Sequence, residues 1–287
     1  MKIGVLGAGA WGTALAILSK KAGNQVTLWS YDGMMKNFEG IKKQTKLNIT
    51  KNISDLSDMD AWLVVTPAAY FRETIRKSAK FYKRKPIIIC TKGIEPKTNK
   101  FMSEILNEEI PNCKDFGVLS GPQFAAEVAN DVPTGSTLAG TKNTLIVGRQ
   151  ILKGMYLEES NDIIGAEICG VGKNAVALIS GYTSIKALGE NEKALLFTRA
   201  WNEVVDFGLA NGAKIRSFLG LCGIGDLFLS ATSKTSRNYS AGLSLANKKP
   251  ITGTVEGISA LNGLIFRSKK LKVSMPVLKE LKLKMGI

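Results

Sequence analysis

A glycine-rich turn near the start of the chain constrains the fold more than any other feature. Gly7, Gly9 and Gly12 stand in GAGAWG, after the apolar run KIGVL (2–6) and before the helical pattern AWGTALAILSKKAG (10–23). One glycine makes the turn, the next lets a pyrophosphate touch the backbone, and the third permits close helix-sheet packing. A second apolar run, QVTLW, follows the helix, which is the β-α-β context of such turns. The sequence therefore predicts dinucleotide binding rather than a purely structural glycine turn.

Short apolar and β-branched runs recur through the first half of the chain. They alternate with helical segments such as YFRETIRKSAKFY. This alternation predicts a doubly wound, mostly parallel sheet of the Rossmann type, with its ligand beyond the carboxyl ends of the strands. The runs that we expect as strands are 2–6, 25–29, 61–65, 86–90 and 116–120.

Long helical patterns dominate after about residue 158. Apolar residues recur at spacings of three and four in 172–188 and 191–212, and Gly212 ends the second pattern. We therefore expect an α/β protein with a dinucleotide-binding Rossmann domain over 1–158 and an all-helical substrate and catalytic domain over 159–287. Several dehydrogenases of hydroxylated metabolites share this plan, with substrate in the cleft between the domains, but the fold alone does not say which.

The chain is strongly basic, but its basic residues do not form a pattern typical of nucleic-acid binding. Lys and Arg total 39 against 24 Asp and Glu, a net charge of +15. The excess is nearly all lysine and is scattered, whereas arginine is the residue that forks onto bases and phosphates. We interpret KFYKRK (80–85) as a solvated face, expect no nucleic-acid partner, and expect the basic field to attract an anionic substrate.

The cysteines and the apolar segments indicate in which cellular compartment the protein is expected. Cys90, Cys113, Cys169 and Cys222 lie far apart, and the chain has no histidine to complete a metal site, so we expect reduced thiols and no metal. Four glycines in the first twelve residues argue against a secretory signal. Outside this N-terminal stretch, no segment approaches the ~18 uncharged apolar residues of a membrane span. We expect a cytoplasmic protein without stable membrane insertion.

A single lysine, Lys173, lies in EICGVGKNAVALISG (167–181), among mostly small and apolar side chains. Without histidine, proton transfer near neutral pH needs another group, and a lysine can serve. We interpret Gly170, Gly172 and Asn174 as a narrow, polar helix start beside the cleft. From these residues alone, a helix lysine that extends to solvent explains Lys173 equally well.

Six motifs in order along nearly the whole chain resemble bacterial NAD(P)-dependent glycerol-3-phosphate dehydrogenases. Related dehydrogenases share the glycine turn but are not expected to combine SGP, GIGD and SRN. The resemblance implies hydride transfer that interconverts dihydroxyacetone phosphate and sn-glycerol 3-phosphate, an NAD or NADP cofactor, a homodimer, and supply of glycerol 3-phosphate for phospholipid synthesis. The motifs are GAGAWGTALA (7–16), TKGIE (91–95), SGPQFAAEV (120–128), GAEICGVGKNAVAL (165–178), GLCGIGDLFLSATSKTSRN (220–238) and VEG (255–257).

The resemblance makes Lys173 the catalytic residue. Reduction of a ketone places negative charge on oxygen, which needs a proton or a cation there. In the reverse direction Lys173 must be neutral, so its pKa should lie below the usual ~10.4. Lys92 is the candidate second ammonium that lowers this pKa, with a surface lysine as the alternative. Asp226 is expected to orient Lys173 or to hold a substrate hydroxyl, with a helix N-cap as the alternative.

The resemblance assigns the other site residues. TSRN offers a hydroxyl, a guanidinium and an amide to the substrate phosphate, although SRN could simply cap a helix. The substrate-binding residues are Lys92, Gly121, Gln123, Asp226, Ser236, Arg237 and Asn238. The cofactor-binding residues are Gly7, Gly9, Ala10, Trp11, Gly12, Tyr31, Lys92, Ala125, Arg237 and Glu256.

Three departures from the family pattern affect these assignments. Gln123 stands where serine or threonine is usual; its longer amide could still donate to a substrate oxygen. The segment 42–56 is shortened. Tyr31 replaces a basic residue near the adenosine ribose, and in LWSYD neither the acid typical of NAD sites nor the arginine of NADP sites is clearly placed. The sequence therefore leaves the choice between NAD and NADP open.

Two alternatives remain: a related two-domain dehydrogenase of another small hydroxy metabolite, and a non-catalytic basic binding protein. Lys92, Lys173, Asp226 and Arg237 are all retained. A protein without catalytic activity has no need for this whole constellation, so the residues favour an active enzyme.

Overall fold

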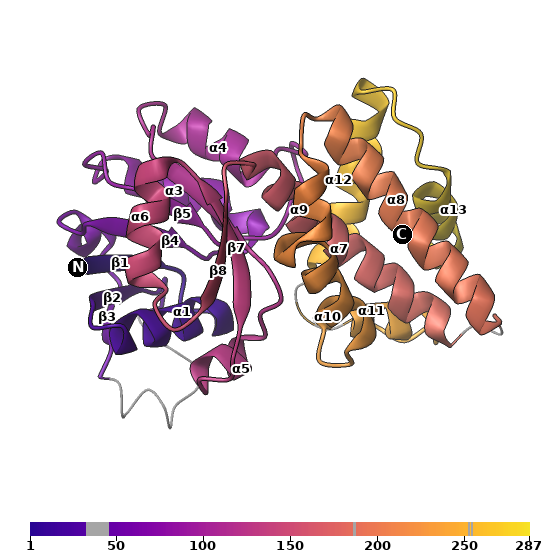
Figure 1. The fold of residues 1–287 in the computed structure, drawn as a ribbon, viewed down its shortest axis with the longest axis horizontal. Coiled ribbons are helices and arrows are strands. Elements are labelled where there is room, and N and C mark those ends of the chain that lie inside the picture. Colours follow the sequence, from indigo (N-terminus) through magenta and orange to yellow (C-terminus); the bar gives the residue numbers. More distant parts are fainter. Residues whose placement is uncertain (33–45, 186–187, 252, 254) are drawn as a thin grey trace. The chain divides into compact units, whose positions relative to one another are not determined.

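The protein forms two compact units in its computed structural model (Figure 1). The sequence places the domain boundary between 158 and 159, whereas the units change over between Ile163 and Ile164, and two short segments of the first half belong to the second unit. The first unit comprises Met1–Thr91, Phe101–Leu119 and Gln123–Ile163, and the second comprises Lys92–Lys100, Ser120–Pro122 and Ile164–Ile287. The structure describes residues 1–32, 46–185, 188–251, 253 and 255–287.

An eight-stranded sheet in the order β3-β2-β1-β4-β5-β6-β7-β8 is the framework of the first unit. The strands from β3 to β6 pair in parallel, and Val5 lies beside Leu28 on one side and Leu63 on the other. The predicted doubly wound, mostly parallel sheet is thus confirmed. The strands are β1 (Lys2–Leu6), β2 (Gln25–Trp29), β3 (Asn48–Thr50), β4 (Ala61–Val64), β5 (Ile87–Ile89), β6 (Phe116–Ser120), β7 (Gly135–Gly140) and β8 (Tyr156–Ser160).

The last two strands, β7 and β8, were not predicted. They pair in parallel with each other. The N–H of Thr141 donates to the carbonyl of Phe116 at 3.3 Å, which places the end of β7 beside the start of β6, so the two run antiparallel. β8 has the sequence YLEES and none of its residues is fully buried. Such an edge strand has no continuous apolar run, and for this reason the predicted boundary at 158 falls inside it.

Helices flank the sheet, and a glycine stands near each end of the first of them. α1 follows Gly9 and ends just before Gly23, whose φ of +88° suits a residue without a side chain. Part of the segment expected to be shortened, 42–45, lies outside the described residues. The helices of this unit are α1 (Ala10–Lys21), the 3-10 helix η1 (Ile53–Leu56), α3 (Ala68–Ala79), α4 (Met102–Glu109), α5 (Ala125–Ala129) and α6 (Lys142–Ile151).

From Ile164 to Ile287 the regular elements that the structure describes in the second unit are all helices, as predicted for the C-terminal half. Its helix α7 is long and apolar enough to cross a membrane, but 78% of its apolar window is buried inside the protein. Packing in a core accounts for that composition. The helices are α7 (Ile163–Ser184), α8 (Glu190–Ala210), α9 (Ile215–Leu219), the π-helical turn η2 (Leu221–Gly225), α10 (Asp226–Thr232), α11 (Arg237–Ala246), α12 (Glu256–Lys270) and α13 (Pro276–Met285).

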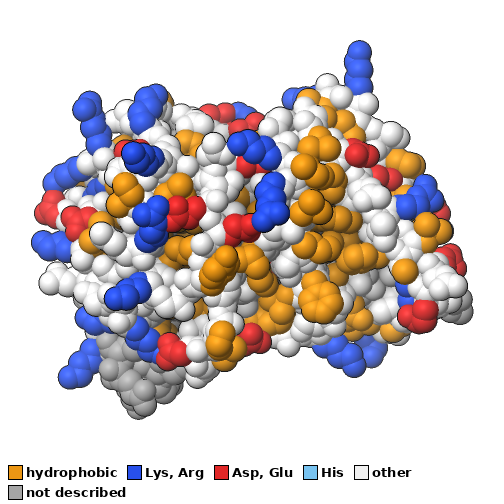
Figure 2. Space-filling view, viewed as in Figure 1, with side chains coloured by type: hydrophobic (Ala, Val, Ile, Leu, Met, Phe, Trp, Pro, Cys, Tyr) orange, Lys and Arg blue, Asp and Glu red, His pale blue; other side chains and the backbone are white. Residues whose placement is uncertain are grey.

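The basic segment 80–85 is only partly a solvated face. Lys83 is exposed and pairs with Asp58 at 2.6 Å. Lys85 is instead buried; its Nζ donates to the carbonyl of Leu56 at 3.2 Å and lies 4.9 Å from the centre of the Trp62 ring. Figure 2 shows Lys and Arg side chains dispersed over the first unit, with acidic side chains between them, on the face drawn.

Glu203 of α8 caps the start of α13. Its carboxylate accepts from the N–H groups of Val277 at 2.7 Å and Leu278 at 3.0 Å. The residue before α13, Met275, offers no side-chain cap. Burial raises the pKa of Glu203, and the two backbone donors oppose that rise. This carboxylate therefore satisfies N–H groups that would otherwise be buried without partners.

We expect Glu203→Ala to lower the free energy of unfolding by ~1–3 kcal/mol, because it leaves buried N–H groups unsatisfied. Glu203→Gln, which keeps one acceptor, should recover part of the loss. Urea denaturation measures both. The control, Glu280→Ala, removes an exposed pair with Lys284 and should cost less than ~0.5 kcal/mol. Equal losses at 203 and 280 would contradict the capping role.

Candidate active site

The glycine turn of the first unit has the geometry that a pyrophosphate needs. Gly7 has φ of +118°. A Cβ on Gly12 would lie 1.9 Å from the carbonyl oxygen of Gly7, so a side chain there would collide with the turn. A Cβ on Gly9 would meet no atom within 4 Å, which leaves the backbone open to a ligand. These three residues therefore fit a dinucleotide at the start of α1.

The other residues that were assigned to the cofactor lie in or next to elements of the first unit. Ala10 and Trp11 form the first turn of α1. The Nε1 donor of Trp11 is buried and has no partner among the described residues. Ala125, the first residue of α5, packs against the same core as Trp11. The ring of Tyr31, just after β2, is 81% exposed.

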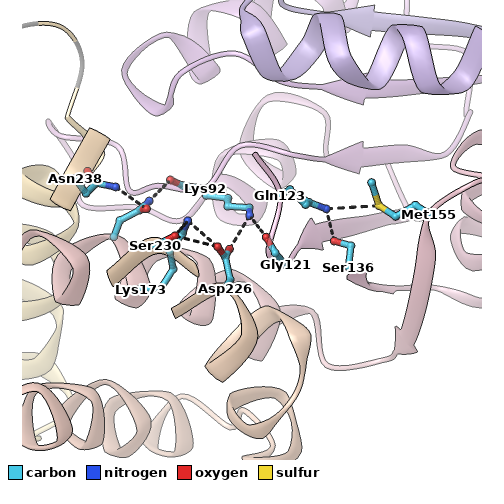
Figure 3. A network of polar contacts seen from close by, with 10 residues as sticks. Lys92, Gly121, Gln123, Ser136, Met155, Lys173, Asp226, Ser230 and Asn238 are labelled. Atoms are coloured by element: carbon cyan, nitrogen blue, oxygen red, sulfur yellow. Dashed lines mark hydrogen bonds and ion pairs between the residues drawn. The ribbon is translucent and has the colours of Figure 1, made fainter. Parts of the chain in front are cut away.

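The centre of the second unit is a carboxylate shared by two lysines (Figure 3). Asp226 accepts from Lys173 Nζ at 2.9 Å through Oδ1 and from Lys92 Nζ at 2.7 Å through Oδ2. Only 1% of the Asp226 side chain is exposed, against 11% for Lys173 and 15% for Lys92. Lys92 Nζ also donates to the carbonyl of Gly121 at 2.7 Å. Two positive charges and one negative charge thus meet in a nearly dry site.

Burial and neighbouring charges shift the ionisation of this cluster. Burial lowers the pKa of Lys173 to about 8; Asp226 opposes the change, and Lys92 and Arg237 add to it. For Asp226, burial favours the neutral acid but is outweighed by Lys173 and Lys92, so its pKa is lowered. Asp226 therefore stays ionised while Lys173 is set to exchange a proton near neutral pH.

Ser230 belongs to the cluster and was not singled out from the sequence. Its Oγ accepts from Lys173 Nζ at 2.8 Å and donates to Asp226 Oδ1 at 3.2 Å. It lies four residues after Asp226 on α10, so both side chains are on one face of the helix. Once Asp226 is identified as a site residue, this spacing of four indicates that Ser230 lies beside it.

A chain of amide groups fixes the backbone around the two lysines. Asn174 Nδ2 donates to the carbonyl of Lys92 at 3.1 Å. Asn238 Nδ2 donates to Asn174 Oδ1 at 2.8 Å, and the N–H of Gly257 donates to Asn238 Oδ1 at 2.9 Å. This chain joins the segment after β5 to α7, α11 and the start of α12. Asn238 and Asn174 are both buried, so the chain forms inside the unit.

The remaining predicted residues stand at helix starts or outside the cluster. Ser236 caps α11 by accepting from the N–H of Tyr239 at 3.4 Å, and the exposed Arg237 begins that helix. Glu256 begins α12. Gln123, in the first unit, donates through Nε2 to Ser136, and no described hydrogen bond joins it to the lysine cluster. The amide donor that was expected to reach substrate is thus already engaged.

Lys173 lies in the middle of α7, so the expectation of a helix start at Gly170 to Asn174 is wrong. The two glycines instead allow close packing. A Cβ on Gly172 would lie 2.2 Å from Cγ1 of Val204, and one on Gly170 would lie 3.0 Å from Ser120 Oγ. Close approach, and not helix termination, explains why these positions lack side chains.

The fold and the two sites define an NAD(P)-dependent dehydrogenase with a Rossmann unit and a helical unit. Profiles described as NAD-dependent glycerol-3-phosphate dehydrogenase N-terminus and C-terminus match residues 2–146 and 162–283. The chain belongs to the NAD-dependent glycerol-3-phosphate dehydrogenase family. This confirms the resemblance seen in the six motifs, the oxidoreductase class, and a cofactor that is NAD or NADP.

Individual relatives agree with the family assignment. Glycerol-3-phosphate dehydrogenase (NAD(P)+) of Parvibaculum lavamentivorans is 35% identical over an alignment that covers 96% of this chain and 89% of that protein. Its counterpart in Afipia carboxidovorans is 37% identical, with the same coverage.

Solved structures show the same fold. A glycerol-3-phosphate dehydrogenase from Coxiella burnetii has a TM-score of 0.87 and 27% identity, over 99% of this chain and 94% of that one. A ketopantoate reductase from Ralstonia eutropha, with a TM-score of 0.68 and 14% identity, covers 100% of this chain and 97% of that one. At that identity it shares the fold alone.

We expect Gly172→Ala to lower the free energy of unfolding by ~1–3 kcal/mol, because the new methyl group collides with Val204. Adding Val204→Ala should relieve the collision, so the double variant should lose less than the sum of the two single losses. Urea denaturation measures all three. Gly189→Ala is the matched control, since a Cβ there meets no atom within 4 Å and φ is −68°. Strict additivity at 172 and 204 would contradict this packing.

Proposed function

We propose that the chain interconverts dihydroxyacetone phosphate and sn-glycerol 3-phosphate and that Lys173 holds the transferred proton at the substrate's C2 oxygen. The observation that carries this proposal is the Asp226 carboxylate shared by Lys173 and Lys92 at 2.9 and 2.7 Å. When bound, the nicotinamide supplies or removes the hydride. Lys173 gives its proton to the oxygen as the ketone is reduced, and takes it back as the alcohol is oxidised.

Lys92 and Asp226 support this proton transfer in different ways. The ammonium of Lys92 stabilises negative charge that develops on the oxygen, and it lowers the pKa of Lys173. Asp226 orients the amino groups of Lys173 and Lys92 through hydrogen bonds. Its negative charge also offsets one of their two positive charges. Ser230 holds Lys173 from a second direction. The residual charge of the three ionised groups is one positive unit, which suits an anionic substrate.

The substrate phosphate is assigned to the start of α11. Arg237 offers a permanent guanidinium there, and Ser236 and Asn238 flank it in sequence. One Nδ2 hydrogen of Asn238 is used on Asn174, which leaves the other for phosphate. Gly121 and Gln123 complete the substrate contacts. One Nε2 hydrogen of Gln123 is used on Ser136, and the other, which lies toward Met155 Sδ at 3.7 Å, would turn to the substrate.

The cofactor is assigned to the glycine turn, with the contributions that the family resemblance implies. That resemblance also implies cofactor contacts from Arg237, Lys92, Glu256, Tyr31 and Ala125. The wider setting proposed is a cytoplasmic homodimer without stable membrane insertion that supplies glycerol 3-phosphate for phospholipid synthesis.

We expect Lys173→Ala to lower kcat for dihydroxyacetone phosphate reduction by ~10²–10⁴-fold, because the proton donor is lost. Absorbance at 340 nm with NADH and with NADPH measures the rate. Lys269→Ala, an exposed lysine of α12, is the control and should keep full activity. Unchanged turnover in the Lys173 variant would refute the role of this residue. Faster turnover of another hydroxy acid by the unaltered enzyme would favour the related-dehydrogenase alternative.

The two reaction directions should respond oppositely to pH. Reduction needs the protonated lysine and should fall as pH rises through about 8, whereas oxidation should rise there. Asp226→Asn removes a charge that raises the pKa of Lys173, so both transitions should move to lower pH. Lys92→Met removes a charge that lowers it, so both should move to higher pH. Profiles of kcat/KM measure these shifts, and transitions that stay in place in both variants would contradict the assignment.

A further inference from the structure

We propose that Gly263 and Arg267 of α12 position Lys92, the second lysine of the site, by fixing the segment Lys92–Lys100 that carries it. The inference rests on the proposed function, because it concerns the placement of a charge in that reaction. Both are positioning residues, which act through contacts with this segment.

The segment that carries Lys92 packs with the helical unit and not with the sheet that precedes it. Lys92–Lys100 belongs to the second unit, although Met1–Thr91 before it and Phe101–Leu119 after it belong to the first. Lys92 itself comes three residues after the end of β5. Contacts with the helices can therefore set where its ammonium group lies.

Hydrogen bonds close the segment into a compact loop. The N–H of Asn99 donates to the carbonyl of Glu95 at 2.9 Å, and the N–H of Glu95 donates to the carbonyl of Lys100 at 3.0 Å. Asn99 has φ of +57°, a left-handed conformation that asparagine adopts more readily than most residues. Because these bonds join the two ends of the loop, a displacement at Asn99 is passed back to Glu95 and to the residues before it.

Helix α12 contacts this loop at two points on one face. A Cβ on Gly263 would lie 2.8 Å from both Cδ1 and Cγ2 of Ile94, whose side chain is fully buried. Arg267 Nη1 donates to the carbonyl of Asn99 at 3.0 Å. Gly263 and Arg267 are four residues apart and therefore lie on the same face of the helix. The missing side chain at 263 lets the loop lie directly against α12, and the guanidinium holds the turn at Asn99.

The start of the same helix fixes the backbone of Lys92. The N–H of Gly257, the second residue of α12, donates to Asn238, and Asn238 donates to Asn174. Asn174 in turn donates to the carbonyl of Lys92. α12 thus fixes both Lys92 and the loop that follows it, and from this backbone the Lys92 side chain meets Asp226 Oδ2 at 2.7 Å (Figure 3).

The placement of Lys92 controls the charge that Lys173 experiences. The charged groups that act on Lys173 are Asp226 of α10, Arg237 of α11 and Lys92. Lys92 lowers the pKa of Lys173 and also shares Asp226 with it. If Lys92 withdraws with its segment, the pKa of Lys173 should rise, and the substrate oxygen should lose a stabilising positive charge during reduction.

Removal of the Arg267 contact tests the proposal. Arg267→Met should lower kcat for dihydroxyacetone phosphate reduction roughly three- to tenfold, the scale of one hydrogen bond, and should move the pH transition of kcat/KM to higher pH, as Lys92→Met does. Arg267→Lys keeps a donor and should recover part of both effects. Arg149→Met removes an exposed arginine that pairs with Glu159 and should change neither. A loss of kcat with an unmoved pH transition would show a merely structural role and overturn the proposal.

The glycine contact gives an independent test. Gly263→Ala places a methyl group against Ile94 and should act in the same directions as Arg267→Met, whereas Ile94→Ala makes room for that methyl group. The double variant should therefore lose less kcat than the product of the two single losses. Strictly multiplicative losses would contradict the role of this contact.

A variant without Lys92 shows whether the effect acts through that residue. In the Lys92→Met background the pH transition has already moved, and Arg267→Met should move it no further. A second shift as large as that in the unaltered background would show that Arg267 acts by another route, and would overturn the proposal.

Direct titration of Lys173 separates this inference from the proposed function. NMR of the enzyme labelled at its lysine ε-carbons, with Lys173→Arg to assign the signal, reports the pKa of Lys173 without turnover. A pKa raised by Arg267→Met in an enzyme that oxidises neither NADH nor NADPH with dihydroxyacetone phosphate would refute the function and support the positioning role. Turnover by the unaltered enzyme, with a pKa that Arg267→Met leaves in place, would support the function and refute the positioning role.

Discussion

The sharing of one buried carboxylate between two lysines is the interaction on which the rest of the site depends. Moving a charge out of water costs several kcal/mol, and a pair repays this only when its hydrogen bonds are complete. Asp226 has both oxygens bound to ammonium groups, and Ser230 and Gly121 accept further lysine protons. The cluster can therefore be nearly dry and still ionised. Its excess of one positive charge is what an anionic substrate would neutralise.

The surrounding helices are shaped to hold that cluster in place. Gly172 lets α7 approach Val204, and Gly170 leaves room for Ser120 and Lys92. The amide chain from Lys92 through Asn174 and Asn238 then fixes the backbone without adding charge. Attraction between the two lysines and Asp226 does not by itself define a single geometry. Close packing and neutral hydrogen bonds therefore position these ionised groups. Apolar packing therefore surrounds the buried cluster of charged side chains and holds it in place.

Sequence reasoning succeeded where a physical pattern is local. The five predicted strands are buried apolar runs, and all five are present. β3, β7 and β8 were missed: β3 has only three residues, β7 is rich in small residues, and β8 is polar. Lys85 was misjudged for a related reason, because a buried lysine satisfied by backbone carbonyls looks like any other lysine in a basic segment.

The sequence by itself determined the Rossmann plan, the glycine turn and the family, and the family motifs singled out Lys173, Lys92 and Asp226 as candidates. It could do so because turn geometry, hydrophobic period and ordered motifs are properties of neighbouring residues. Only the tertiary structure decided that these three side chains share one buried contact and that Ser230 and Asn174 join them. Each of these depends on distance in space between residues far apart in the chain or on a side-chain direction. Burial, which shifts the pKa of Lys173, exists only once the fold has removed water.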